Sequence, residues 1–181
     1  NFVDLSEVIL GPGTGKSELL LLRNAEHLRN LNSLYISCGM SRIQAKRLFD
    51  RPHLRRLQNL RVPGQPIGDE GARALSMAIG SGPPNERMDQ LQKLDLQGCS
   101  IGSTGAASLL EIMSFRHLSS LDLSNNPTIG NDAVGKLTES GQFYKTLYTL
   151  ELGRTGLGDD GAKSLAAAGF PRLSALGLSD N

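Results

Sequence analysis

Apolar and polar residues alternate in short runs that return along most of the chain. The clearest copy is Leu91 to Leu109, where Leu94-Asp95-Leu96 is followed by a small residue, an Ile-Gly turn and an amphipathic segment that begins with Gly-Ala. Alternation over three or four residues predicts a short strand with one buried face, and the helical spacing after it predicts a helix. Each copy therefore predicts one strand, one turn and one helix that crosses back over the strand.

The copies cover nearly the whole chain with a period of 26 to 34 residues. The Leu-x-x-Leu-x-Leu motif begins at Leu5, Leu31, Leu57, Leu91, Leu118, Leu147 and Leu173. Self-similarity at this period indicates a solenoid rather than a single closed core. We predict an α/β horseshoe in which a parallel sheet lines the concave face and the helices lie on the convex face. Residues 1–181 are expected to form one array of about seven repeats, cut at both ends from a longer protein.

In repeats three to seven, one position after the strand is occupied by a small or polar residue. It is filled by Gln65, Cys99, Asn126, Thr155 and Asn181. Together with the Ile-Gly and Gly-Ala positions, this pattern resembles the leucine-rich repeat of the ribonuclease-inhibitor type, which Ran GTPase-activating proteins and NOD-like receptors also use. The resemblance implies the horseshoe fold, and it implies that these side chains bond loop backbone between neighbouring coils.

Composition narrows the functional classes. The 181 residues carry a net charge of +1, so no global attraction to nucleic acid or to a membrane is expected. No run is long and apolar enough to predict a membrane span. The two cysteines, Cys38 and Cys99, lie at similar points of non-adjacent repeats, and no cysteine-rich cap flanks the array. We therefore expect a reducing, cytoplasmic location.

Two segments depart from the repeat. Residues 42–61 contain seven lysine or arginine residues and a single acid, Asp50. We interpret this run mainly as a solvated helix face, with a phosphate-binding surface as the alternative. The long third repeat carries an insertion at 81–88, SGPPNERM, which predicts a loop because Gly-Pro-Pro cannot continue a helix. A tolerated surface insertion is favoured over a binding element.

The segment Gly11 to Ser17 is similar to a nucleotide-binding P-loop. A P-loop needs four residues between its first Gly and the Gly-Lys pair, and this segment has three when counted from Gly11. The position that should be Gly is Leu10, which the first strand needs for its core. We therefore predict no nucleotide binding.

The sequence contains no recognisable catalytic motif. His27, His53 and His117 recur at the same phase of the repeat, which predicts a structural role near helix ends rather than a metal site. We predict no enzyme activity, no catalytic residue, no cofactor and no metal.

The candidate functional residues are the outward-facing side chains of the strands, which the fold leaves free. We predict that partner contacts are made by Tyr35, Arg61, Lys93, Asp95, Asp122 and Glu151. The first hypothesis is a non-enzymatic protein-protein interaction module whose concave acidic stripe binds a basic partner surface. Two alternatives stay open: a regulator of an enzyme, such as a GTPase activator with Arg154 or Asn125 at the rim, and a structural spacer within a larger protein.

Overall fold

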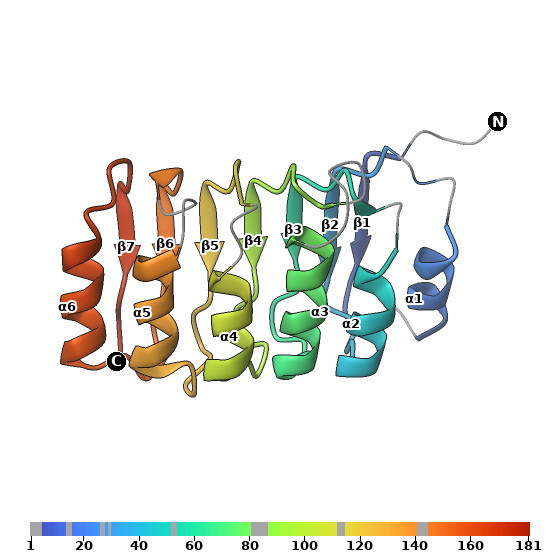
Figure 1. Cartoon of the computed structure of the whole chain (residues 1–181). Helices are drawn as coiled ribbons and strands as arrows, with labels where there is room; N and C mark the ends of the chain where they lie inside the picture. The colour runs from blue at the N-terminus through green and yellow to red at the C-terminus, as the bar shows by residue number, and fades with distance from the viewer. Residues whose placement is uncertain are drawn as a thin grey trace.

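The strands of the chain form one parallel sheet in sequence order. The computed structural model describes residues 5–13, 16–25, 28, 30–51, 54–80, 87–111, 115–140 and 145–181. Within these ranges, seven strands pair in the order β1 to β7, and a helix follows each of the first six. Figure 1 shows the helices stacked as one layer over one face of the sheet, while the other face is left open. This is the predicted leucine-rich repeat architecture.

The elements are short and nearly uniform. The strands are β1 (Glu7–Leu10), β2 (Ser33–Ile36), β3 (Asn59–Arg61), β4 (Lys93–Asp95), β5 (Ser120–Asp122), β6 (Thr149–Glu151) and β7 (Ala175–Gly177). The helices are α1 (Lys16–Arg23), α2 (Arg42–Phe49), α3 (Gly68–Gly80), α4 (Ser103–Leu110), α5 (Gly130–Ser140) and α6 (Asp159–Ala168). None of these helices, as far as the structure describes them, has the length and apolarity that a membrane crossing requires.

The core is a ladder of leucines at the centre of the strands. Strand pairing aligns Leu34, Leu60, Leu94, Leu121 and Leu150, all of which are buried. Burying a leucine side chain contributes about 1.5–3 kcal/mol, so each repeat depends on its neighbours to cover the same position. The residues before and after each leucine point to the open face, as the period-2 alternation of a strand dictates.

The Gly-Ala positions allow the helices to approach one another closely. A Cβ atom added to Gly105 in α4 would lie 2.5 Å from Asp69 Oδ1 and 3.1 Å from the Cβ of Ala72 in α3. Only a residue without a side chain fits there, because interiors are packed without spare volume. The small residues predicted at the start of the helix therefore set the spacing between repeats.

The polar side chains at the position after the strand link neighbouring loops, as the resemblance implied. Asn126 is fully buried; its Oδ1 accepts from the Ile101 N–H at 3.0 Å, and its Nδ2 donates to the carbonyl oxygen of Leu96 at 3.0 Å. Gln65 Oε1 accepts from the backbone N–H groups of repeat two, and Asn181 bonds the backbone of repeat six. These bonds satisfy backbone groups that short strands and turns leave unpaired.

Thr155 departs from this pattern. Its hydroxyl donates to the carbonyl oxygen of Leu152, at 2.7 Å within its own repeat, and the link between repeats six and seven is made by Asn181. A threonine side chain is too short to reach the preceding loop.

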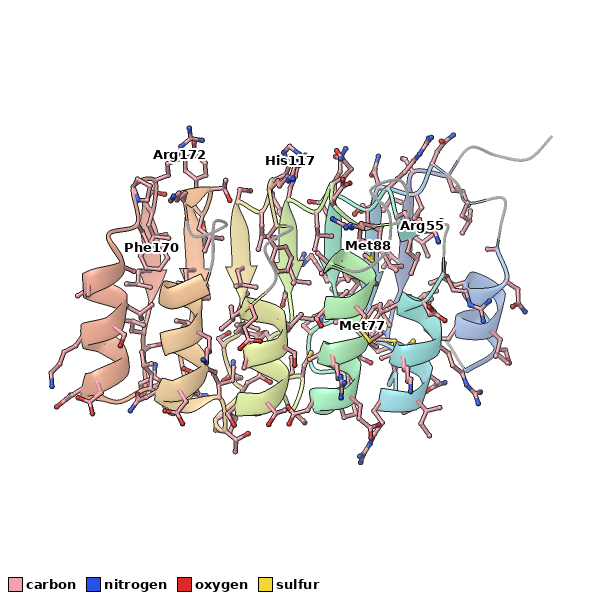
Figure 2. All side chains as sticks on the ribbon, in the orientation of Figure 1. Arg55, Met77, Met88, His117, Phe170 and Arg172 are labelled. Atoms are coloured by element: carbon pink, nitrogen blue, oxygen red, sulfur yellow. The ribbon has the colours of Figure 1, made fainter. Side chains whose placement is uncertain are left out.

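The end of the insertion at 81–88 packs against the core: Met88 is buried, and its N–H donates to the Ala78 carbonyl at 3.0 Å, while residues 81–86 lie outside the described residues. The expectation for the histidines needs correction. His117 is exposed in a bend, several residues after α4 ends with Glu111 as its C-cap, so it has no helix-terminal role (Figure 2). His27 and His53 lie outside the described residues.

Candidate functional site

The register of the sheet brings the predicted partner-binding residues together. Tyr35 lies opposite Arg61, and the line continues through Asp95 and Asp122 to Glu151. Lys93 lies in the adjacent outward column, two residues before Asp95 on the same strand. All six line one shallow depression of about 730 Å³ on the open face of the sheet.

Arg61 is held in place from both sides. Its Nε lies 3.1 Å from Asp95 Oδ2, and its Cζ lies 5.3 Å from the centre of the Tyr35 ring. The Arg61 side chain is still 57% exposed, so a cation-π contact and an ion pair fix its direction without burying it. The guanidinium is therefore oriented before any partner arrives.

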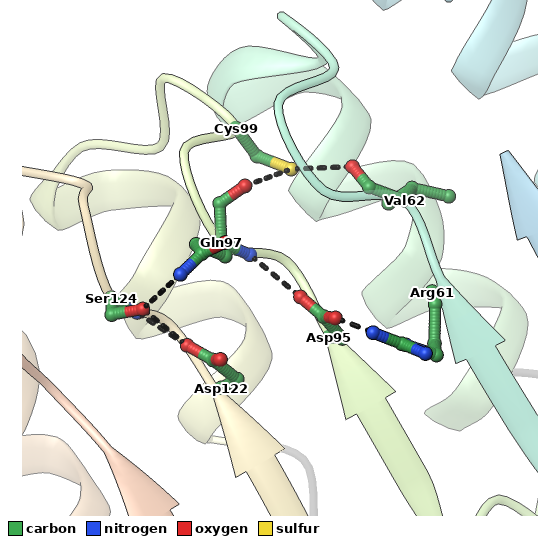
Figure 3. A network of polar contacts seen from close by, with 7 residues as sticks. All are labelled: Arg61, Val62, Asp95, Gln97, Cys99, Asp122 and Ser124. Carbon is green, nitrogen blue, oxygen red and sulfur yellow. Dashed lines mark hydrogen bonds and ion pairs between the residues drawn. The ribbon is translucent and has the colours of Figure 1, made fainter. Parts of the chain in front are cut away.

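The three acids of the predicted stripe are not equivalent. Asp95 is only 18% exposed and faces Arg61, so its charge is partly neutralised within the chain. Asp122 accepts hydrogen bonds from the N–H and the hydroxyl of Ser124, at 2.9 and 2.6 Å (Figure 3). Glu151 forms no ion pair with any residue in the described part of the chain, and its carboxylate extends over Gly177, where a Cβ would collide with it. The negative field of the face is thus concentrated at Asp122 and Glu151.

Gln97 and Ser124 join the network, and we did not predict them as site residues. The Gln97 N–H donates to Asp95 Oδ1 at 3.2 Å, and its side-chain amide donates to Ser124 Oγ at 3.2 Å (Figure 3). Each follows its acid by two residues, which is the spacing at which an aspartate bonds local backbone. That spacing was a usable signal in the sequence.

Cys99 closes the network on its buried side. Its Sγ donates to the Val62 carbonyl at 3.1 Å, from behind the loop that carries Gln97. Burial raises the pKa of this thiol to about 12, and the nearby carboxylates of Asp95 and Asp122 add to the effect. Cys99 is therefore a neutral structural residue and not a nucleophile.

The rim of the sheet holds the two residues considered for a regulatory role. Arg154 is exposed, and its Nε and Nη2 both lie 2.9 Å from Asp180 Oδ2. Asn125 is exposed in the left-handed conformation, with φ of 57°. Both line a second depression of about 500 Å³, beside Asp122 and Glu151.

The described residues of the Gly11 to Ser17 segment lie between β1 and the start of α1. Leu10 is buried in the core as predicted, Pro12 and Gly13 turn, and α1 begins at Lys16. Thr14 and Gly15 lie outside the described residues. In the parts of the chain that the structure covers, no group of three or more His, Cys, Asp or Glu side chains is placed to hold a metal.

Comparison with known proteins agrees with this geometry. A family model described as a leucine-rich repeat matches residues 91–110, 116–137 and 145–166, which span three consecutive repeats. The chain is built of leucine-rich repeats. Their strand, loop and full helix are those of the ribonuclease-inhibitor type, as the sequence pattern indicated.

Two human proteins are similar to this chain in sequence. The chain is 37% identical over 131 residues to NACHT, LRR and PYD domains-containing protein 5, covering 69% of the chain and 10% of that protein. It is 33% identical over 104 residues to NACHT, LRR and PYD domains-containing protein 13, covering 57% of the chain and 9% of that protein. The chain therefore spans about a tenth of the length of these relatives.

Among solved structures, the leucine-rich repeat array resembles a chain in the crystal structure of the yeast Rad7 and Elc1 complex. The TM-score is 0.42 at 15% identity, over 96% of this chain and 63% of the other.

Proposed function

We propose that this leucine-rich repeat array is a protein-protein interaction module that binds a basic surface of a partner protein on its concave sheet face. Asp122 and Glu151 supply the negative charge, and Tyr35, Arg61, Lys93 and Asp95 form the adjoining part of the contact surface. The observation that carries the proposal is the alignment of these six side chains in one depression, where the fold itself requires none of them.

The charge distribution supports a basic partner. Asp122 and Glu151 lie on adjacent strands, whose backbones are about 4.8 Å apart, and both residues are half-buried in the depression. Their two negative charges lie on the same face, so a lysine or arginine of the partner can pair with either carboxylate there. The ordered Arg61 at the other end offers further donors to the same partner.

Both cysteines support a reducing location for this activity. Cys38 and Cys99 are free thiols, and Cys99 is protected by burial. We propose a cytoplasmic setting, where thiols remain reduced.

The test is affinity capture from cell extract followed by titration of the captured partner against purified variants. Asp122→Asn combined with Glu151→Gln keeps the size of both side chains, and the amide oxygen introduced at position 122 can still accept from Ser124. Asp132→Asn combined with Asp159→Asn is the matched control, because these two acids are exposed on helices α5 and α6.

We expect the concave variant to weaken binding at least tenfold and the control to change it less than twofold. Equal affinities for the two variants would show that the partner binds elsewhere. If the captured partner is a small GTPase whose GTP hydrolysis the array accelerates, the regulatory alternative with Arg154 or Asn125 replaces this proposal. Failure to capture any partner would favour the spacer role.

A further inference from the structure

Helix α2 presents a cationic surface on the side of the molecule opposite the proposed site. Arg42, Ile43, Lys46 and Arg47 are exposed, while Ala45, Leu48 and Phe49 face the core. We call the five residues Arg42, Ile43, Lys46, Arg47 and Arg51 the α2 basic face. At 1.5 Å per residue, the part of this face from Arg42 to Arg47 extends about 8 Å along α2, and Arg51 follows after the helix ends. Arg55, labelled in Figure 2, and Arg56 continue the positive charge along the connection to β3.

The local balance of charge on α2 is unlike that of its neighbours. Helices α3, α5 and α6 each begin with acidic residues, whereas α2 contains three cations and no acid. Among the residues whose side chains the structure describes, the acids near it are Asp50 at its C-cap and Asp69 and Glu70 at the start of α3. The Oδ1 atom of Asp69 is already hydrogen-bonded, because it accepts from the Gly102 N–H at 2.7 Å.

Structural roles account for only part of this surface. Lys46 and Arg47 lie in the last turn, where cations stabilise the helix dipole, and Arg51 Nε donates to the Arg47 carbonyl at 3.2 Å. The dipole argument fails for Arg42, which occupies the first turn at the positive end of the helix. Ile43 is 58% exposed, although the capping box of Ser41 and Gln44 already starts the helix without it.

We infer that the α2 basic face binds an acidic segment of a partner protein, with Ile43 contacting an apolar side chain within that segment. Arg42 opposes the helix dipole and Ile43 exposes an apolar side chain to water. Residues that cost stability in this way are expected to gather at functional sites. Binding would place negative charge beside Arg42, and it would bury the side chain of Ile43.

The composition of the face favours an acidic polypeptide over other polyanions. Single-stranded nucleic-acid sites use aromatic side chains for stacking, and no aromatic residue is exposed among the described residues of α2. A membrane-surface helix needs a broad apolar face, and Ile43 is the sole exposed apolar side chain of α2. An acidic segment with one apolar residue matches both the charge and the single apolar contact.

The probe for the test is a fluorescein-labelled peptide of repeated Glu-Glu-Leu triplets. Its binding to the 181-residue chain is measured by fluorescence anisotropy. The test variant is Arg42→Gln with Arg47→Gln. The control is Arg116→Gln with Arg172→Gln, which removes the same charge from exposed arginines ahead of β5 and β7 (Figure 2 labels Arg172). Circular dichroism checks that all variants keep the fold.

We expect the α2 variant to weaken binding of the acidic peptide about tenfold, and the control to weaken it less than twofold. Raising the salt concentration should reduce this difference, because exposed charges are screened. Ile43→Ser should weaken binding of the Glu-Glu-Leu peptide about fivefold, and it should leave binding of a Glu-Glu-Ser peptide unchanged.

The inference is overturned if the peptide does not bind, if the two arginine variants lose affinity equally, or if Ile43→Ser affects neither peptide. Tighter binding of a single-stranded oligonucleotide or of vesicles that contain phosphatidylserine would assign the face to those ligands instead. The concave variant Asp122→Asn with Glu151→Gln should bind the acidic peptide like the unmodified chain. The proposals for the two surfaces can therefore be contradicted independently of one another.

Discussion

Two columns of side chains run along this array, and each repeat contributes one residue to each column. One column lies in the loops and is mostly buried, and the other is exposed on the sheet. The buried column includes Asn126 and Gln65, whose side chains bond backbone groups of the preceding repeat. In the exposed column, Arg61 pairs with Asp95, and Asp122 accepts a hydrogen bond from Ser124. The fold determines which residue types the first column can hold, whereas the second column can vary without loss of the fold. The exposed column is therefore where a partner can be specified.

The largest expected difference between the columns is at Asn126. Asn126→Ala leaves the Ile101 N–H and the carbonyl oxygens of Leu96 and Leu123 without their partner in the core. We expect the free energy of unfolding to fall by about 3–4 kcal/mol, since each unsatisfied buried group costs about 1–3 kcal/mol. Urea unfolding followed by circular dichroism measures this loss.

Asn125 provides the matched control for that change. It is the adjacent residue, exposed and in the left-handed region, so Asn125→Ala loses only the conformational preference of asparagine. A cost of about 1 kcal/mol is expected. Similar losses for the two variants would contradict the role of Asn126 as the buried link.

An effect that appears only at high pH is expected from Cys99. Burial raises the pKa of this thiol to about 12 from 9.0. Below pH 9 both the folded and the unfolded chain keep the proton, so the stability is fully present. As the pH rises from about 9 towards 12, the unfolded chain loses a proton that the folded chain retains, and stability falls by up to about 1.4 kcal/mol per pH unit.

Cys99→Ala removes this contribution, so its free energy of unfolding should fall less steeply than that of the unmodified chain above pH 9. Urea unfolding at a series of pH values measures both slopes. The difference between them isolates Cys99, because lysine and tyrosine residues titrate in both chains. Parallel slopes would mean that the thiol has its ordinary pKa.

The smallest effect is expected in the exposed column. A double-mutant cycle of Arg61→Ala and Asp95→Ala should give a coupling energy of about 0.2–1 kcal/mol, because Arg61 remains largely in water. Unfolding in urea at low and high salt measures the coupling, which should decrease with salt. A coupling above about 2 kcal/mol would place this pair among the residues that the fold requires, and it would remove the contrast between the columns.

The repeat and the alignment of the strands follow from the amino-acid sequence alone. The spacing of the leucines fixes which residues are buried, and a parallel register then places Tyr35, Arg61, Asp95, Asp122 and Glu151 in one line. The spacing of the leucines can be read within a short stretch of sequence, and the same spacing gives the same fold in each repeat. The buried loop position was predictable for the same reason, except at Thr155, where the length of the side chain decides what it reaches.

The pairing of the outward side chains depends on the tertiary structure. The sequence places three carboxylates in one column. The structure pairs Asp95 with Arg61, bonds Asp122 to Ser124, and extends Glu151 over Gly177. The tertiary structure also places Met88 in the core, at the end of an insertion that the sequence predicts as a surface loop. Such contacts join residues of different repeats at distances of a few ångströms. They depend on side-chain directions and on the spacing of the repeats, which a pattern of apolar and polar positions does not contain.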